Sequence, residues 1–106
     1  MKTKSTDIDP QVLRYAARDA VDALKLLANE DRLLLLCQLL QGEMCVSELQ
    51  DALDIHQPTL SQQLGVLRNE GAVGTRREGK NIYYHVAKPA LQEILSVLYR
   101  LYCPKD

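Results

Sequence analysis

The stretch that decides the fold of this chain is QPTLSQQLGVLR, residues 57–68. Pro58 favours the start of a helix, because its ring holds a helical φ angle and its missing N–H would have no partner in a first turn. Leu60, Leu64 and Leu67 then follow at the spacing of one helix face. The opposite face carries hydrogen-bonding side chains and no carboxylate, which suits the edges of DNA bases lying between phosphates. The sequence therefore predicts a recognition helix that begins at Pro58.

A short helix and a turn are predicted directly before the recognition helix. Residues 47–53 (SELQDAL) have a helical pattern, and residues 54–57 can form the turn. The residues expected to face inward are Val46, Leu49, Ala52 and Leu53. A helix, a short turn and a second helix make up the helix-turn-helix pattern of DNA-binding proteins.

A β-hairpin is predicted directly after the recognition helix. Residues 72–78 and 81–86 alternate around a two-residue connection, Gly79-Lys80, as the two strands of a hairpin do. The residues expected to share one face are Val73, Thr75 and Arg77 of the first strand, and Ile82, Tyr84 and Val86 of the second. The basic residues near the tip, which would touch phosphates as those of a wing do, are Arg76, Arg77 and Lys80.

The charge is divided along the chain in a way that favours DNA at this unit. The net charge is −1, but residues 1–54 hold 6 basic and 10 acidic residues, residues 55–80 hold 4 and 2, and residues 81–106 hold 3 and 2. Local positive charge at the predicted helix and wing would release counterions from phosphates. The predicted contacts to double-stranded DNA are Gln57, Thr59, Ser61, Gln62, Gln63, Arg68, Arg76, Arg77 and Lys80.

The length of 106 residues predicts one winged helix-turn-helix domain over residues 1–106, with residues 1–8 flexible. Aliphatic residues must fill its core, since the chain has no Phe and no Trp. The longest apolar run, Leu33 to Cys37, is far shorter than the roughly 20 residues of a membrane span, and no signal segment opens the chain. We expect a soluble, cytoplasmic protein with no membrane contact.

Helices are predicted on both sides of the DNA-reading unit. Asp9-Pro10 begins one that is rich in small residues, residues 30–41 form a second, and Lys88-Pro89 begins the last. The fold class is thus mainly α with a small β-hairpin wing. The first and last helices carry more apolar surface than one small core needs, so we expect a homodimer through these helices and an inverted-repeat operator. The alternative is a monomer in which both helices pack on their own core.

Three stretches of the chain resemble the ArsR/SmtB family of winged-helix repressors. They are LKLLANEDRLLLL at residues 24–36, residues 48–67, and residues 71–84 of the predicted wing. The resemblance extends to the BigR-like branch, which responds to sulfide and persulfide, through QPTLSQQLGVLR, through Cys37, and through LYC at residues 101–103. It implies a transcriptional repressor that binds DNA as a dimer.

The cysteines are candidate sensing residues. In a cytoplasmic protein, Cys37, Cys45 and Cys103 are not a structural disulfide framework, so each is a buried small side chain or a reactive thiol. Cys37 lies among leucines, whereas Cys103 ends a helix next to Lys105, which favours a thiolate. The two could bond only if packing brings their Cα atoms within about 7 Å. The resemblance implies that Cys37 and Cys103 are the sensing pair and that a bridge between them releases the operator.

Other functions remain open at this stage. A metal- or metalloid-responsive repressor would use Cys45, but Cys45-Val46-Ser47 lacks the second cysteine of the family's Cys-Val-Cys pattern, and no CxxC or HxxH spacing is present. We therefore predict no metal and no cofactor, a structural role for Cys45, and exposed or DNA-proximal positions for His56 and His85. An enzyme is not expected, since the two histidines are separated and no phosphate-binding loop occurs. A protein-binding winged helix is a further alternative.

Overall fold

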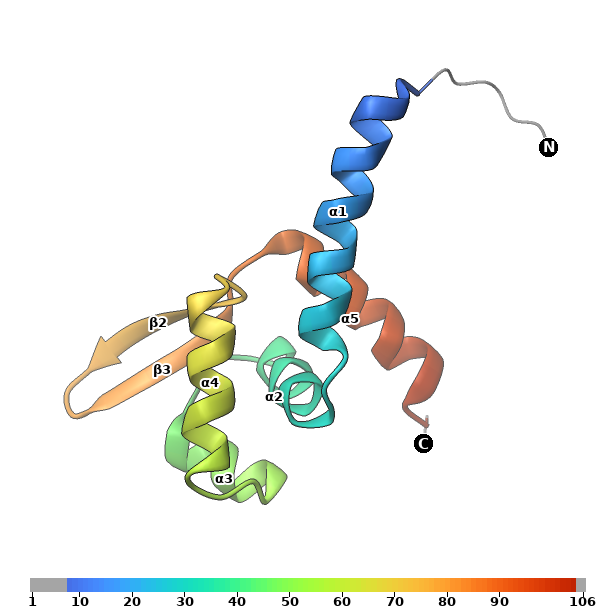
Figure 1. Ribbon diagram of the computed structural model, residues 1–106. Helices are drawn as coiled ribbons and strands as arrows, with labels where there is room; N and C mark the ends of the chain where they lie inside the picture. Colours follow the sequence, from blue (N-terminus) through green and yellow to red (C-terminus); the bar gives the residue numbers. More distant parts are fainter. Residues whose placement is uncertain (1–7, 105–106) are drawn as a thin grey trace.

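The computed structural model describes residues 8–104, and Figure 1 shows its helices and strands. The bounds are α1 Pro10–Leu27, α2 Glu30–Leu40, β1 Met44–Cys45, α3 Val46–Leu53, α4 Thr59–Asn69, β2 Val73–Glu78, β3 Asn81–Val86 and α5 Pro89–Tyr102. The predicted fold class, mainly α with a hairpin wing, is confirmed. The predicted flexibility of the N-terminus concerns residues 1–7, which lie outside the described residues, and Ile8, which is exposed.

Helix α2 lies at the centre of the fold. It contacts α1, α3, α4, α5 and β3, and its Leu35 and Leu36 are completely buried. The apolar run 33–37 therefore forms the core, as predicted, but not on every side, because Leu34 remains 40% exposed. The helix begins at Asn29, whose side chain accepts a hydrogen bond from the Arg32 N–H, and Gly42 follows its end at a φ of +152°.

Helices α3 and α4 form the predicted helix-turn-helix. Asp54 ends α3 in the left-handed conformation, with its N–H donating to Gln50. Helix α4 begins at Thr59, one residue later than predicted, because Pro58 forms the turn with Gln57 and serves as the N-cap. Ala52 is a second correction. Ala52 was predicted to face inward but is exposed, because an eight-residue helix packs only one narrow face against the core.

The hairpin has the predicted pairing. Val73 lies opposite Val86, Thr75 opposite Tyr84, and Arg77 opposite Ile82, so these residues share one face. Gly79 turns the chain at a φ of +63°, which glycine adopts without strain. The sequence did not predict β1, whose two residues pair with β3 and extend the sheet to the order β1-β3-β2.

Helices α1 and α5 leave much apolar surface uncovered. Asp9 caps α1 by accepting from the Gln11 N–H, as predicted. Figure 1 shows α1 projecting away from the other helices, and only Leu27 of this helix is buried. The exposed large apolar residues of the two helices are Val12, Leu13, Tyr15, Val21, Leu24, Val97, Tyr99, Leu101 and Tyr102. So many exposed large apolar side chains on two helices are typical of an interface between protein chains.

Two neighbouring leucines of α2 test this account of the core. Leu36→Ala should lower the free energy of unfolding by about 2–5 kcal/mol, because it removes a fully buried side chain and leaves a cavity. Leu34→Ala should lower it much less in the isolated chain. Urea unfolding followed by circular dichroism at low protein concentration measures both, and equal losses would contradict the central position of Leu36.

Candidate nucleic-acid interface and thiol site

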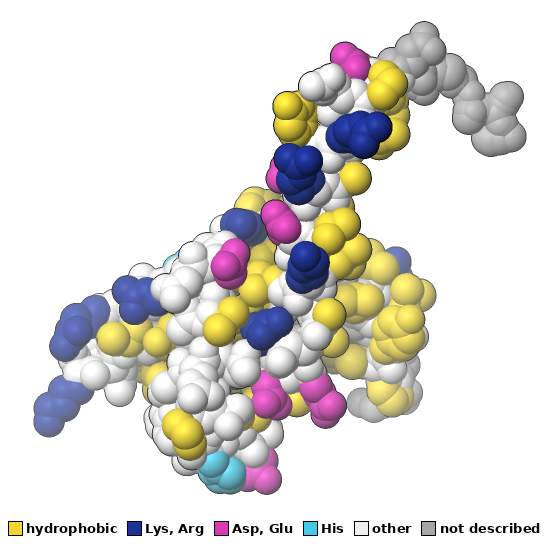
Figure 2. Space-filling view, viewed as in Figure 1, with side chains coloured by type: hydrophobic (Ala, Val, Ile, Leu, Met, Phe, Trp, Pro, Cys, Tyr) yellow, Lys and Arg dark blue, Asp and Glu magenta, His cyan; other side chains and the backbone are white. Residues whose placement is uncertain are grey.

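Helix α4 presents a polar face to solvent while its apolar stripe holds it on the core. Leu60, Leu64 and Leu67 are buried, as predicted. Of the predicted DNA contacts on this helix, Ser61, Gln62 and Arg68 are exposed and Thr59 is half-buried. Figure 2 shows this face next to the lysines and arginines that gather on the wing. The surface combines hydrogen-bonding groups for base edges with cations for phosphates.

Two predicted contacts on or beside α4 have partners within the chain instead. The Gln57 side chain accepts a hydrogen bond from the Ser61 N–H at 3.1 Å, so it caps the first turn of α4. The Gln63 side chain is half-buried and accepts from Arg32 of α2 at 3.2 Å. Successive residues of a helix point about 100° apart, so Gln62 faces solvent while Gln63 faces α2. The sequence predicted DNA contacts for Gln57 and Gln63 and did not predict these bonds within the chain.

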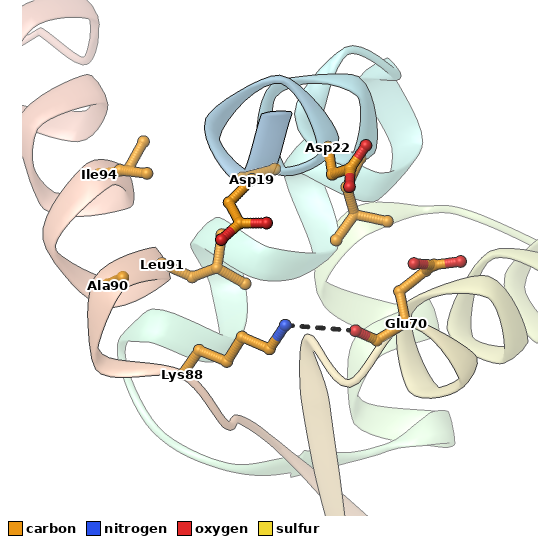
Figure 3. Close-up of a pocket in the computed structure, with 9 residues that line it drawn as sticks. Asp19, Asp22, Glu70, Lys88, Ala90, Leu91 and Ile94 are labelled. Atoms are coloured by element: carbon orange, nitrogen blue, oxygen red, sulfur yellow. Dashed lines mark hydrogen bonds between the residues drawn. The ribbon is translucent and has the colours of Figure 1, made fainter. Parts of the chain in front are cut away.

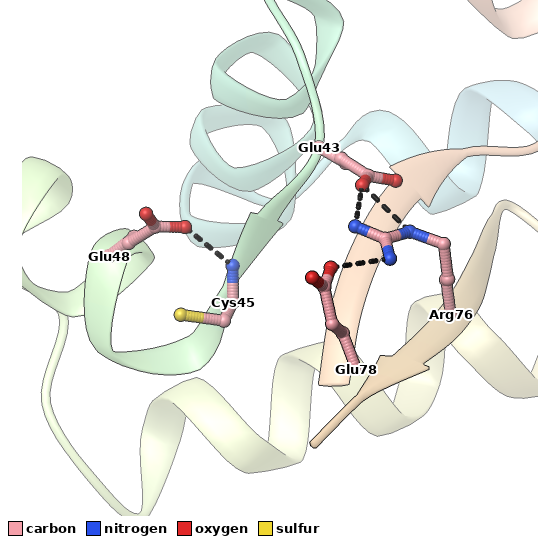
Figure 4. A network of polar contacts seen from close by, with 5 residues as sticks. All are labelled: Glu43, Cys45, Glu48, Arg76 and Glu78. Atoms are coloured by element: carbon pink, nitrogen blue, oxygen red, sulfur yellow. Dashed lines mark hydrogen bonds and ion pairs between the residues drawn. The ribbon is translucent and has the colours of Figure 1, made fainter. Parts of the chain in front are cut away.

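Arg76 of the wing is held between two carboxylates (Figure 4). Its Nε donates to Glu43 at 2.9 Å and its Nη2 donates to the same oxygen, while Nη1 donates to Glu78 at 2.7 Å. The guanidinium also lies 4.9 Å from the centre of the Tyr83 ring. Hydrogen bonds from Arg76 hold the pKa of the Glu43 carboxyl below its usual value. The charge of Arg76 is thus paired with Glu43 and Glu78, so the phosphate contact predicted for Arg76 would have to compete with these carboxylates.

Arg77 and Lys80 are the exposed cations of the wing. Because side chains alternate along a strand, Arg77 points to the face opposite Arg76. Neither Arg77 nor Lys80 forms an ion pair with any residue between 8 and 104. The phosphate contacts predicted for these two side chains remain a prediction.

A cavity on another part of the surface has the opposite charge (Figure 3). It has a volume of about 450 Å³ and lies where α1, α5 and the end of α4 meet. Asp19, Asp22 and Glu70 line it with Lys88, whose Nζ donates to the Glu70 carbonyl at 3.4 Å. An excess of carboxylates repels phosphates, so this cavity is unsuited to the DNA backbone.

Cys37 and Cys103 both line a second cavity, which is separate from the acidic one and has a volume of about 300 Å³. Cys37 of α2 is half-buried, Cys103 follows α5 and is exposed, and both are free thiols. The other lining residues are Glu30, Leu33, Leu34, Leu98, Tyr99 and Tyr102. Helices α2 and α5 thus each contribute one thiol to a mainly apolar cavity, although 66 positions separate the two cysteines in the sequence.

The two thiols have different environments. Burial raises the pKa of the Cys37 thiol above its usual value, and the negative charge of a Cys103 thiolate raises it further. A raised pKa means that less of the Cys37 thiol is ionised at neutral pH, and the thiolate is the nucleophilic form. Exposure makes Cys103 the more accessible thiol.

The third cysteine is part of the local structure of α3. Cys45 is buried, its N–H donates to the Glu48 side chain at 3.0 Å, and its sulfur lies 3.3 Å from the Ser47 hydroxyl. This is a capping box at the helix start, which agrees with the structural role predicted for Cys45. Among residues 8–104, no three His, Cys, Asp or Glu side chains are grouped to hold a metal ion. Both histidines, His56 and His85, are exposed.

Sequence reasoning missed three polar side chains that shape the DNA-binding surface: Arg32, Glu43 and Tyr83. Tyr83 could have been found, because the predicted hairpin register places it opposite Arg76. Glu43 lies 33 positions before Arg76 in a loop, and no periodicity links the two. Arg32 stands between the polar residues 29–31 and the apolar run that begins at Leu33, and nothing in the sequence shows that it reaches α4.

Comparison with known proteins agrees with this geometry. The profile of the family described as bacterial regulatory protein, arsR family, matches residues 29–74, which span α2 and the helix-turn-helix. A biofilm growth-associated repressor of Agrobacterium fabrum is 51% identical over 100 residues, covering 94% of this chain and 86% of that protein. The chain belongs to the ArsR family. Its homologues are transcriptional regulators, and this ArsR-family protein is a DNA-binding transcriptional regulator rather than an enzyme.

Solved structures of similar proteins have the same fold. Reduced HlyU of Vibrio cholerae matches with a TM-score of 0.84 and 39% identity, covering 89% of this chain and 99% of that one. The transcriptional repressor BigR of Xylella fastidiosa matches with a TM-score of 0.83 and 40% identity, covering 90% and 94%. The predicted resemblance to ArsR-type winged-helix repressors and to BigR is therefore confirmed. Within the described part of this ArsR-family chain, no helix has the length and apolar character needed to cross a membrane.

The wing arginines should differ in their response to salt. Arg77→Ala should weaken binding to any duplex and reduce the slope of log affinity against log salt concentration by about 1, because one phosphate contact is lost. Arg76→Ala should leave that slope unchanged, since the Arg76 charge is already paired with Glu43 and Glu78. Fluorescence anisotropy with an unrelated duplex over a range of KCl concentrations measures both slopes. An equal reduction in the two variants would show that Arg76 also binds a phosphate.

Proposed function

We propose that this ArsR-family protein is a homodimeric repressor that senses reactive sulfur species through Cys37 and Cys103. The observation that carries the proposal is the placement of both thiols on one cavity between α2 and α5. The protein would bind an inverted-repeat operator when the thiols are reduced and release it when they are bridged. Its DNA contacts would be Ser61, Gln62 and Arg68 of α4 with Arg77 and Lys80 of the wing, supplemented by Thr59.

The proposed chemistry begins at the accessible thiol. The Cys103 thiolate attacks the terminal sulfane sulfur of an inorganic polysulfide. This sulfur becomes the outer sulfur of a Cys103 persulfide, and the rest of the polysulfide, one sulfur shorter, is the leaving group. The Cys37 thiol then loses its proton and attacks the Cys103 sulfur, expelling hydrosulfide and forming the disulfide. Two electrons pass from the thiols to one sulfane sulfur. The raised pKa of Cys37 leaves the first attack to Cys103, because a protonated thiol is a poor nucleophile.

Release of DNA follows from the position of the bridge. Two recognition helices of a dimer must enter successive major grooves, about 34 Å apart. A bond between Cys37 and Cys103 ties the end of α5 to α2, and α5 carries part of the apolar surface proposed to form the dimer. A change in the packing of α5 therefore changes the distance between the recognition helices. A difference of about 3 kcal/mol in operator binding would lower the affinity roughly a hundredfold.

Serine substitutions separate the roles of the three cysteines. Cys37→Ser and Cys103→Ser should bind the operator but no longer release it on addition of inorganic polysulfide, whereas Cys45→Ser, the matched control, should respond as the parent does. Anisotropy follows DNA release, and mass spectrometry identifies the bridged cysteines. Release of the Cys103→Ser variant by polysulfide would contradict the thiol pair. Release of the parent by zinc or arsenite, and not by polysulfide, would indicate a metal-responsive repressor.

The proposed dimer has a separate test. Sedimentation velocity at micromolar concentration should show two copies of the chain, because α1 and α5 leave large apolar side chains exposed. Leu13→Glu and Leu101→Glu place charges on these helices away from the described core and should each favour the monomer. A parent protein that sediments as a monomer would contradict the dimer, as would a dimer unaffected by both substitutions.

A further inference from the structure

Arg32 joins three helices through one side chain. It lies in the first turn of α2, and its guanidinium donates hydrogen bonds to acceptors on α1 and on α4. Arginine suits such a position because its planar guanidinium holds several N–H donors in a fixed geometry. The proposed sensing mechanism does not involve this side chain.

On one side, Arg32 holds the end of α1. Its Nε donates to the Leu26 carbonyl at 2.7 Å and its Nη2 to the Lys25 carbonyl at 3.2 Å. Both carbonyls belong to the last turn of α1; the Lys25 carbonyl also accepts from the Ala28 N–H at 3.3 Å, and Arg32 adds donors at this end of the helix. A positive charge at a helix C-terminus is also favoured by the helix dipole. The direction in which α1 leaves α2 is therefore coupled to Arg32.

On the other side, Arg32 holds the recognition helix. Its Nη1 donates to the Gln63 side chain at 3.2 Å. Among residues 8–104, it is the one side-chain hydrogen bond that joins a residue inside α4 to a residue inside another helix; at the end of α4, Lys88 donates to the carbonyl of the C-cap Glu70. The remaining contacts of α4 with the core come from its buried leucines. Apolar contacts have no preferred direction, whereas a hydrogen bond does, so the Arg32–Gln63 bond restricts the rotation of α4 about its own axis.

We propose that Arg32 is a positioning residue that sets the orientation of the recognition helix relative to α1, with Gln63 as its acceptor. The inference rests on the proposed dimer, since α1 carries part of its surface. If α1 holds the two protomers together, its angle to α4 determines where the two recognition helices lie on DNA. One guanidinium then controls the match between protein and operator spacing, and Gln63 serves this geometry rather than a base.

The test compares a paired site with a half-site. An inverted-repeat duplex is obtained by selection from random-sequence DNA with the parent protein, and a second duplex keeps only one half of it. Arg32→Gln, Arg32→Lys and Gln63→Leu should lower the ratio of paired-site to half-site affinity about tenfold, because a poorly oriented second helix gains less from its half-site. Gln63→Glu should keep the parent ratio, since its carboxylate can still accept from Arg32.

Gln62→Leu is the matched control. It removes an exposed glutamine from both recognition helices, so it should lower the half-site affinity and lower the ratio by the same factor, because the paired site loses the contact twice. The Arg32→Gln, Arg32→Lys and Gln63→Leu variants should instead lower the ratio while their half-site affinity stays close to that of the parent. Partial unfolding would also lower both affinities together, and circular dichroism of each variant measures it separately. If Arg32→Gln does not fold, Gln63→Leu keeps the test intact.

Several outcomes would overturn the inference. A parent-like ratio in Arg32→Lys and Gln63→Leu would show that Arg32 does not orient α4. A Gln63→Leu variant that behaves as Gln62→Leu does would make Gln63 a base contact. If the parent itself shows no preference for the paired site and sediments as a monomer, the proposed dimer fails and this inference fails with it. If the parent is a dimer that prefers the paired site and all the variants keep this preference, the role of Arg32 is contradicted while the proposed dimer stands.

Discussion

Burial of the α2 leucines is the interaction on which the rest of this structure depends. Leu35, Leu36 and Leu39 occupy the centre of the core, and the stripe of α4 leucines packs against the same helix. With no Phe and no Trp in the chain, aliphatic burial supplies the main stabilisation. This packing turns the polar face of α4 outward. It also places α2 between the helix proposed to read DNA and the helix whose end leads to Cys103, the second of the two thiols proposed to sense sulfur species.

Polar side chains then determine what apolar packing leaves undetermined. Leucine contacts hold a helix close to a surface but specify its rotation weakly, whereas a hydrogen bond specifies both partners and direction. Arg32 supplies such a bond between α2 and α4, and Arg76 supplies one between the wing and the loop before β1. Two arginines of the same chain thus act within the protein. The arginine best suited to phosphates is Arg77, because alternation along β2 points it away from the carboxylates.

The thiol cavity connects the same packing to regulation. Helix α2 contributes Cys37, and the end of α5 contributes Cys103 to a cavity lined mostly by apolar side chains. A structural thiol and two candidate sensing thiols differ here by their environments: Cys45 completes a capping box, Cys37 has a pKa raised by burial, and Cys103 is exposed. Helices α2 and α5 already contact each other, so the proposed bridge would require only a small movement of α5. Because α5 carries part of the proposed dimer surface, that movement would change the packing of the two protomers.

The sequence by itself determined the elements, because helix and strand periodicity, N-caps and turn residues act over a few neighbouring positions. The recognition helix, the hairpin register and the exposed apolar surface of α1 were all predicted. Strand β1 was not, since two residues carry no periodicity. Only the tertiary structure decided which polar side chains have partners within the chain: Gln63 bonds to Arg32 and Arg76 bonds to Glu43, and the members of each pair are more than 30 positions apart. Such contacts depend on how helices pack in space, and no local pattern encodes them.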